Sequence, residues 1–131
     1  MREILFRGKQ MDNGEWLFGD LRHIFHGEYR THIVDNSNGL NNGVCGLEVA
    51  SSTVGQFTGL TDRNGVKIFE GDIVRYGQRG KVEYNSGSAQ FTLNFTNSTY
   101  EGFDKIPFCD CEVLGNIHDN PELLEVSGDE P

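Results

Sequence analysis

The sequence lacks the runs that mark membrane-spanning and exported proteins. No apolar stretch approaches the roughly 18 consecutive residues that a helix needs to cross a bilayer. The beginning of the chain, Met1–Ile4, does not combine a charged leader, an apolar segment and a small-residue cleavage site. From these absences we predict a cytoplasmic protein with no membrane partner.

Cysteine is scarce, and its count of three is odd. Without an export signal we expect reduced thiols. Cys109 and Cys111 would point to the same face of a strand, and with His118 they could supply three metal ligands. The fourth ligand would have to be Cys45 or a distant histidine, and structural zinc sites typically use other spacings, such as Cys-x-x-Cys. We favour the alternative that Cys109 and Cys111 are small buried hydrophobic residues.

Basic residues are also few. The 11 lysines and arginines stand against 20 aspartates and glutamates, which gives a net charge of −9. A surface with this excess repels polyanions, so nucleic acid is not the expected partner. The nearest candidate for a basic stripe is Arg75, Arg79 and Lys81, with Tyr76 or Tyr84 as neighbouring aromatic contacts. Three charges on one hairpin are more typical of a solvated strand face, which is the interpretation we favour.

Catalytic patterns are mostly absent. There is no Gly-x-Ser-x-Gly elbow, no phosphate loop and no His-Glu-x-x-His, so we predict a protein that is not an enzyme and holds no cofactor. Glu70-Gly71-Asp72 could bind a cation or act as the acid and base of a metal-dependent hydrolase. We favour a turn at Gly71 in which Asp72 accepts backbone hydrogen bonds. The Asp-x-Asn-Gly fragment that starts at Asp62 has the same interpretation, because the glutamate and helices of an EF-hand are missing.

Glycine and phenylalanine, by contrast, are abundant, at 17 and 9 residues. This mix is typical of a fold with many turns in which aromatic side chains supply much of the buried area. Turn signals at Asn13-Gly14, Gly27 and Asn64-Gly65 predict β-hairpins. Residues 35–46 carry four asparagines and three glycines with few apolar anchors, so we expect a long loop there.

Residues 66–118 are typical of a meander of short strands joined by tight turns. The expected strands are 66–69, 73–76, 81–84, 89–95 and 109–114. In the fourth, Phe91, Leu93 and Phe95 are expected to face the core, and Thr92 and Asn94 to face outward. The strand number and turn density predict a small SH3-like barrel in this half. The predicted fold class is mainly β, with antiparallel hairpins and little helix, since no helical periodicity exceeds about two turns.

A chain of 131 residues is long enough for one domain with a sizeable core. We therefore predict a single domain over residues 1–131. Sub-lobes at 1–53 and 54–126 are an open alternative within that domain.

Three segments resemble the YopX family, small proteins found in phages and prophages. The main segment is Val54–Tyr76, which contains both the Asn64-Gly65 and the Glu70-Gly71-Asp72 turns. The others are the opening Arg2–Gly8 and the closing Glu112–Leu124, so the resemblance extends from end to end. It implies a mainly β fold, a tendency to oligomerise and a phage or prophage context in a bacterial host. The family has no established biochemical activity to carry over.

Two functions remain open from the sequence. The first is a non-enzymatic accessory protein of a phage or prophage, a homo-oligomeric module that binds a protein partner. The alternative is a nucleic-acid-associated phage regulator that uses the barrel-like half, with Arg75, Arg79 and Lys81 among its contacts.

Overall fold

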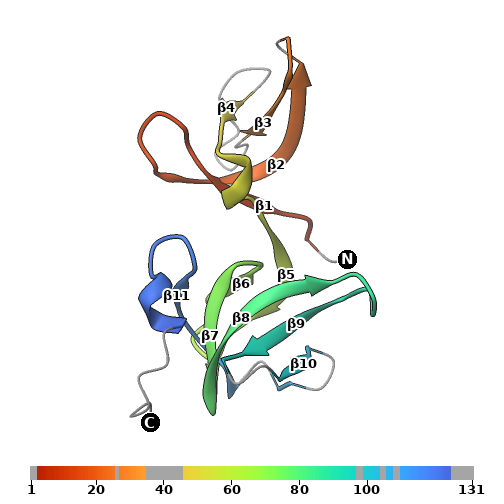
Figure 1. The fold of residues 1–131 in the computed structure, drawn as a ribbon, viewed down its shortest axis with the longest axis vertical. Coiled ribbons are helices and arrows are strands. Elements are labelled where there is room, and N and C mark those ends of the chain that lie inside the picture. The colour runs from red at the N-terminus through yellow and green to blue at the C-terminus, as the bar shows by residue number, and fades with distance from the viewer. Residues whose placement is uncertain are drawn as a thin grey trace. The chain divides into compact units, whose positions relative to one another are not determined.

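The computed structural model describes residues 3–25, 27–34, 46–96, 99–103, 106–107 and 110–124 (Figure 1). The chain forms two compact units, residues 1–57 and residues 58–131. The boundary considered from the sequence, between residues 53 and 54, falls shortly before this division. Most of the loop expected at 35–46 lies outside the described residues. In the described part, no helix is long and apolar enough to span a membrane.

The N-terminal unit is an antiparallel sheet. Its strands are β1 (Phe6–Lys9), β2 (Trp16–Phe25), β3 (Tyr29–Val34), β4 (Leu47–Glu48) and β5 (Gly55–Thr61). They lie in the order β4-β3-β2-β1-β5, and the short 3-10 helix η1 (Ser51–Thr53) precedes β5. Strand β5 continues past Phe57 into the second unit.

Two hairpins build most of this sheet, at the positions that the turn signals predicted. Between β1 and β2, Gly14 has a φ of +73°, and its N–H donates to the Gln10 carbonyl oxygen at 2.9 Å. The Asn13 side chain accepts a hydrogen bond from the Glu15 N–H at 3.0 Å. Between β2 and β3, Gly27 has a φ of +86°. Glycine suits both turns because it adopts positive φ without a steric penalty.

The core of the N-terminal unit is small. Its buried apolar side chains include Ile33 and Val34 on β3 and Val49 just after β4. Gly8 lies so close to Val49 that a Cβ at residue 8 would be 3.0 Å from a methyl carbon of the valine. Several large apolar side chains of this unit remain exposed: Ile4, Met11, Phe18, Phe25 and Tyr29.

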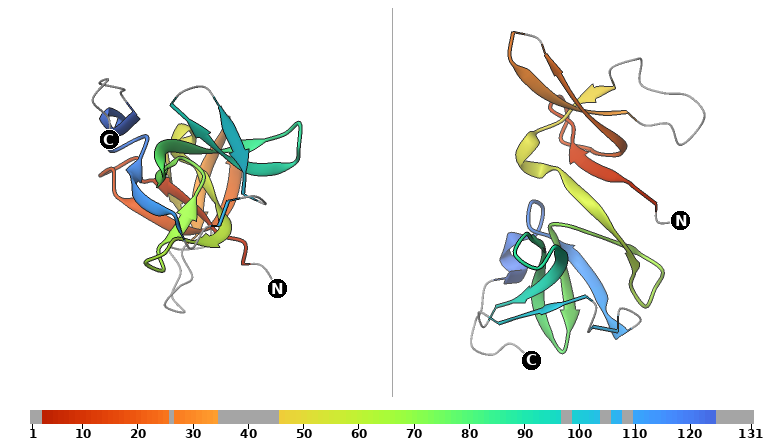
Figure 2. Two further views of the ribbon diagram at one scale, coloured as in Figure 1. Left: turned by 90° about the horizontal axis from the view of Figure 1, so that it is seen from below. Right: turned by 90° about the vertical axis from the view of Figure 1, so that its right-hand side faces the viewer.

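The C-terminal unit contains a five-stranded antiparallel sheet, which Figure 2 shows from two further sides. Its order is β10-β9-β8-β7-β11. The strands of this unit are β6 (Lys67–Phe69), β7 (Asp72–Tyr76), β8 (Gln78–Asn85), β9 (Gln90–Phe95), β10 (Tyr100–Gly102) and β11 (Glu112–Asn116). Strand β6 lies next to β5 and not in this sheet. The short 3-10 helix η3 (Pro121–Leu124) follows β11.

The fold is mainly β, as predicted, but the SH3-like barrel is not confirmed. Strands β10 and β11 are the two edges of the five-stranded sheet, which is therefore open. The segment 66–69, which was expected to be the first barrel strand, forms β6 and pairs with β5. Strand β10, which the sequence pattern did not predict, occupies an edge instead. Turn chemistry and alternation locate strands, but they do not say which edges meet.

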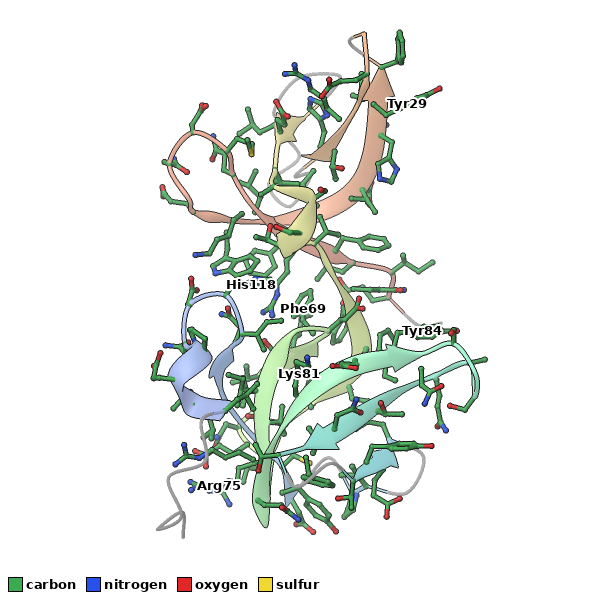
Figure 3. The ribbon with its side chains drawn as sticks, in the orientation of Figure 1. Tyr29, Phe69, Arg75, Lys81, Tyr84 and His118 are labelled. Atoms are coloured by element: carbon green, nitrogen blue, oxygen red, sulfur yellow. The ribbon has the colours of Figure 1, made fainter. Side chains whose placement is uncertain are left out.

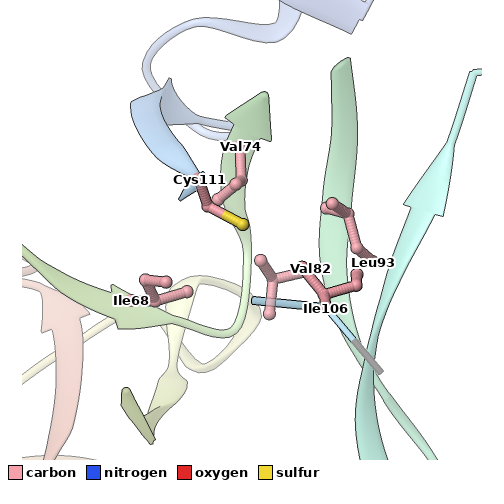
Figure 4. Close-up of a cluster of buried hydrophobic side chains, with 6 residues drawn as sticks. All are labelled: Ile68, Val74, Val82, Leu93, Ile106 and Cys111. Atoms are coloured by element: carbon pink, nitrogen blue, oxygen red, sulfur yellow. The ribbon is translucent and has the colours of Figure 1, made fainter. Parts of the chain in front are cut away.

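A compact apolar core lies against the five-stranded sheet (Figure 4). Its fully or almost fully buried members are Ile68, Val74, Val82, Leu93, Ile106 and Cys111. Phe91 and Phe95 pack against this cluster and are partly buried. The prediction that Phe91, Leu93 and Phe95 face one core is therefore confirmed.

The expectation for the other face of β9 is wrong at Thr92. This residue is only 1% exposed, and its Oγ1 donates to Asn94 Oδ1 at 2.7 Å. Asn94 is half-buried and in turn donates from Nδ2 to Glu83 Oε1 at 2.9 Å. Alternation assigns a side chain to a face, but it does not say whether other segments cover that face.

Candidate functional site

The structure separates the five residues considered as nucleic-acid contacts onto two faces of the sheet. In the pairing of β7 with β8, Arg75 lies opposite Arg79, and Lys81 is two residues further along β8, so the three cations share one face. Because successive side chains of a strand point to opposite faces, Tyr76 and Tyr84 lie on the other face of the sheet. Figure 3 shows Arg75, Lys81 and Tyr84 well apart on this unit. The tyrosines therefore cannot stack on a nucleic-acid strand that the cations hold.

Each of the three cations already has a partner within the unit. Arg75 Nη2 is 3.3 Å from Glu112 Oε1, and Lys81 Nζ is 2.6 Å from Glu83 Oε2. Arg79 Nη1 donates to the Leu123 carbonyl oxygen of η3 at 3.2 Å. A phosphate group would have to compete with these contacts, so this face is a mixed polar surface and not a basic stripe.

Asp62 organises the turn between β5 and β6. Its Oδ1 accepts hydrogen bonds from the N–H groups of Asn64 at 2.8 Å and Val66 at 2.9 Å, and its Oδ2 accepts from Val113 of β11 at 2.9 Å. Burial by itself raises the pKa of this carboxyl, but the three N–H donors and Arg63 outweigh it and hold the pKa below its usual 3.8. Because backbone N–H groups surround the carboxylate, the geometry is that of the favoured turn and not of a cation site.

Glu70-Gly71-Asp72 is also a turn, between β6 and β7. Gly71 has a φ of +93°, and the buried Asp72 accepts a hydrogen bond at Oδ2 from the Phe69 N–H at 2.7 Å. The Gly71 carbonyl oxygen accepts from the Ile117 N–H at 2.9 Å. The hydrogen bond from Phe69 agrees with the interpretation that we favoured, in which Gly71 makes a turn and Asp72 accepts backbone hydrogen bonds. Within the described ranges, no three His, Cys, Asp or Glu side chains are grouped so that they could hold a metal ion.

Of the three cysteines, Cys111 is within the described residues, whereas Cys45 and Cys109 are not. Cys111 is buried in the core of the C-terminal unit, and its Sγ lies 3.8 Å from the Pro107 carbonyl oxygen. His118 is half-buried in the turn after β11. The burial of Cys111 among aliphatic side chains agrees with a packing role.

We expect protein purified under reducing conditions to contain no stoichiometric metal. EDTA should leave its melting temperature unchanged, because Cys111 packs in an apolar core. Elemental analysis and thermal melts with and without chelator measure the two quantities. Zinc at one equivalent that disappears in a His118→Gln variant would contradict this prediction and favour the ligand set of Cys109, Cys111 and His118.

An exposed aromatic pair lies at the end of the β2–β3 hairpin. Phe25 and Tyr29 are cross-strand partners whose ring centroids are 5.2 Å apart in an edge-to-face arrangement. They are 62% and 74% exposed, and Figure 3 shows Tyr29 at the end of the hairpin. Sequence reasoning missed this pair, although two aromatic residues flanking a short turn at Gly27 signal a cross-strand contact. Large apolar side chains this exposed are typical of an interaction surface.

Charge is divided unevenly between the two units. Residues 1–57 contain five basic and seven acidic side chains, whereas residues 58–131 contain six basic and thirteen acidic ones. Near the end of the β2–β3 hairpin, Arg22 and Arg30 are both exposed, and Arg30 lies 3.6 Å from Glu48. An anionic partner therefore meets the least repulsion at the N-terminal unit.

Comparisons with known proteins agree with this architecture. A family model described as YopX protein matches residues 5–125. The chain is similar to the crystal structure of protein EF1440 from Enterococcus faecalis, with 26% identity and a TM-score of 0.56 over 95% of this chain and 100% of that one. It also resembles the X-ray structure of protein yopX from Bacillus subtilis, with 15% identity and a TM-score of 0.53 over 96% of this chain and 98% of that one, a likeness of fold alone. A search of the curated proteins finds no match.

Proposed function

Since the chain belongs to the YopX family, we propose that it is a non-enzymatic accessory protein of a phage or prophage that self-associates and acts by binding a protein partner. The observation that carries this proposal is the exposed apolar surface of the N-terminal unit. Five of the eight large apolar side chains exposed in the described residues belong to it, although it is the smaller unit. Phe25 and Tyr29 of this set contact each other, and contiguous exposed apolar side chains are typical of protein–protein contacts.

Strand edges are a second reason to expect self-association. Strands β4 and β10 lie at the ends of their sheets. The chain has only three prolines and few lysines, so residues that usually protect edges are sparse. Pairing with identical subunits in a closed, symmetric oligomer covers such edges and confines them to defined contacts.

Self-association is expected to depend on salt in a specific direction. Each added subunit brings a net charge of −9, so an oligomer should loosen at low salt. It should tighten as added salt shortens the Debye length to about 10 Å near 0.1 M. Light scattering at several salt concentrations, from micromolar to millimolar protein, measures the mass of the assembly.

A strict monomer at every concentration would refute the self-association.

An electrophoretic shift assay distinguishes the nucleic-acid alternative from the proposed function. In this assay we expect weak or no binding of DNA or RNA. Sub-micromolar binding at physiological salt that is lost in an Arg75→Ser, Arg79→Ser variant would favour a nucleic-acid regulator instead. A Tyr100→Ser variant is the matched control, because Tyr100 is exposed on the same sheet but lies on the edge strand β10.

A further inference from the structure

The Phe25–Tyr29 pair leaves ring surface open to solvent at the end of the β2–β3 hairpin. The two rings are inclined at 68°, so the edge of one ring meets the face of the other. Both side chains nevertheless remain more than half exposed. The faces of an aromatic ring carry partial negative charge, and a lysine or arginine side chain placed over such a face is attracted to it. The exposed ring surface is therefore suited to cationic side chains.

A carboxylate lies at the same end of the hairpin. Glu28 is exposed and directly precedes Tyr29, in the turn where Gly27 has a φ of +86°. A cation that approaches the rings therefore also approaches a counter-ion. His23 shares the strand face of Phe25 and is exposed, so a protonated imidazole there would oppose a cation. Binding is for this reason best measured at about pH 8, where histidine side chains are ordinarily neutral.

The opposite face of the hairpin carries charges of both signs and favours neither. Strand alternation places Asp20, Arg22 and Arg30 together on that face. The register of β3 with β4 adds Glu48, which lies 3.6 Å from Arg30. Two cations are thus matched by two carboxylates, and this face offers no clear site for a charged partner. The rings and Glu28 are the distinctive chemistry at this end of the unit.

We propose that the end of the β2–β3 hairpin binds an arginine-rich segment of a partner protein. Guanidinium groups of the segment lie over the rings of Phe25 and Tyr29 and form an ion pair with Glu28. Arginine suits such a surface better than lysine, because its guanidinium is planar, stacks on aromatic faces and is more weakly hydrated than an ammonium group. This inference rests on the proposed function and specifies the chemistry of the partner.

The net charge of the chain also favours a cationic partner. At −9, the protein repels nucleic acid, and a second copy of the chain brings the same charge to the contact. A cationic segment is instead attracted, and complementary charge accelerates its encounter with the protein at low salt. The overall charge thus selects the sign of the partner, and the exposed rings determine where it binds.

Three peptides that carry the same neutral dye test this proposal against the full-length protein. The first contains four arginines separated by glycine and serine, the second has lysine and the third citrulline in place of each arginine. Citrulline keeps the planar shape of the arginine side chain and removes its charge. By fluorescence anisotropy near 0.1 M salt and at about pH 8, we expect affinity to fall from arginine to lysine to citrulline, by about tenfold in all. We expect amide shifts in an NMR titration to cluster at residues 23–25 and 28–30.

Protein variants test the same surface from the other side. Phe25→Leu and Tyr29→Leu keep an apolar side chain but remove a ring, so each should weaken binding of the arginine peptide about two- to fivefold. Glu28→Gln should weaken it and also reduce its dependence on salt. Tyr100→Leu and Glu101→Gln are matched controls, because they alter an exposed tyrosine and its exposed glutamate neighbour on β10 of the other unit, and they should leave binding unchanged. Circular dichroism checks that each variant is folded.

Several outcomes would overturn the proposal. Equal binding of the citrulline and arginine peptides would remove the charge argument, and unchanged binding in Phe25→Leu and Tyr29→Leu would remove the role of the rings. Tighter binding of an oligothymidylate that Phe25→Leu abolishes would assign the surface to nucleic acid. A loss of oligomer mass in Phe25→Leu would assign it to a second copy of this chain. If no peptide binds while light scattering still shows an oligomer, this inference fails and the self-association in the proposed function stands.

Discussion

Replacing Leu93 by alanine is expected to lower the free energy of unfolding by about 2 to 5 kcal/mol. Leu93 is 0% exposed and packs in the cluster with Val82 of β8 and Val74 of β7. The truncation removes apolar contacts and leaves a cavity, which strands held in register by their hydrogen-bond ladder can close only partly. Urea unfolding followed by far-ultraviolet circular dichroism measures the change.

Two variants serve as controls for this prediction. Glu101 lies directly opposite Leu93 on β10 but is exposed, so Glu101→Ala should change stability by no more than about 0.5 kcal/mol. Leu93→Met keeps the side-chain volume and should cost less than about 1.5 kcal/mol. If Leu93→Ala were as stable as the wild type, this residue would not belong to the core of the C-terminal unit.

Replacing Asp62 by alanine is expected to cost about 3 kcal/mol. The carboxylate is almost fully buried and accepts three backbone N–H bonds, one of them from Val113 of β11. Its removal leaves donors without an acceptor and releases the turn between β5 and β6 from β11. Arg63→Ala, at the next residue, is the control. Arg63 is half exposed and lies 3.4 Å from Glu112, so its loss should cost at most about 1 kcal/mol.

The contribution of Asp62 also depends on pH. Its pKa is lower in the folded protein than its usual 3.8, so the folded state favours the ionised form. Such a group contributes stability that is fully present above the unfolded pKa and is lost as the pH falls through the folded pKa. The stability difference between wild type and Asp62→Asn should therefore be constant from pH 7 to about 5 and shrink below about pH 4. A difference that grew on acidification would contradict the assignment.

Local sequence chemistry was a good guide to the hairpins. Asn64-Gly65 lies in the turn between β5 and β6, and Gly65 has a φ of +81°. The alternation of Phe91, Leu93 and Phe95 identified the face of β9 that meets the core. Both signals work because they depend on a few neighbouring residues, whose backbone preferences do not change with the rest of the fold.

Less of the candidate site could be predicted from the sequence. The sequence showed that Arg75, Arg79 and Lys81 are neighbours, but it did not show their partners. Two of these partners lie far along the chain, and the third, Glu83, lies two residues from Lys81 on the same strand. Glu112, for example, is 37 residues from Arg75, and the Leu123 carbonyl is 44 residues from Arg79. A pattern of basic residues does not indicate whether distant carboxylates and carbonyls will neutralise it.

The sequence by itself therefore determined that this protein is built of antiparallel β-hairpins, where several of its turns lie, and which side of β9 is apolar. Only the tertiary structure decided that the C-terminal sheet is open, that Thr92 is buried, and that Phe25 and Tyr29 remain exposed. The physical reason is the range of the forces involved. Turn conformation and side-chain alternation are set within a few residues, whereas strand order, coverage of a face and neutralisation of a charge depend on contacts between segments distant in the chain.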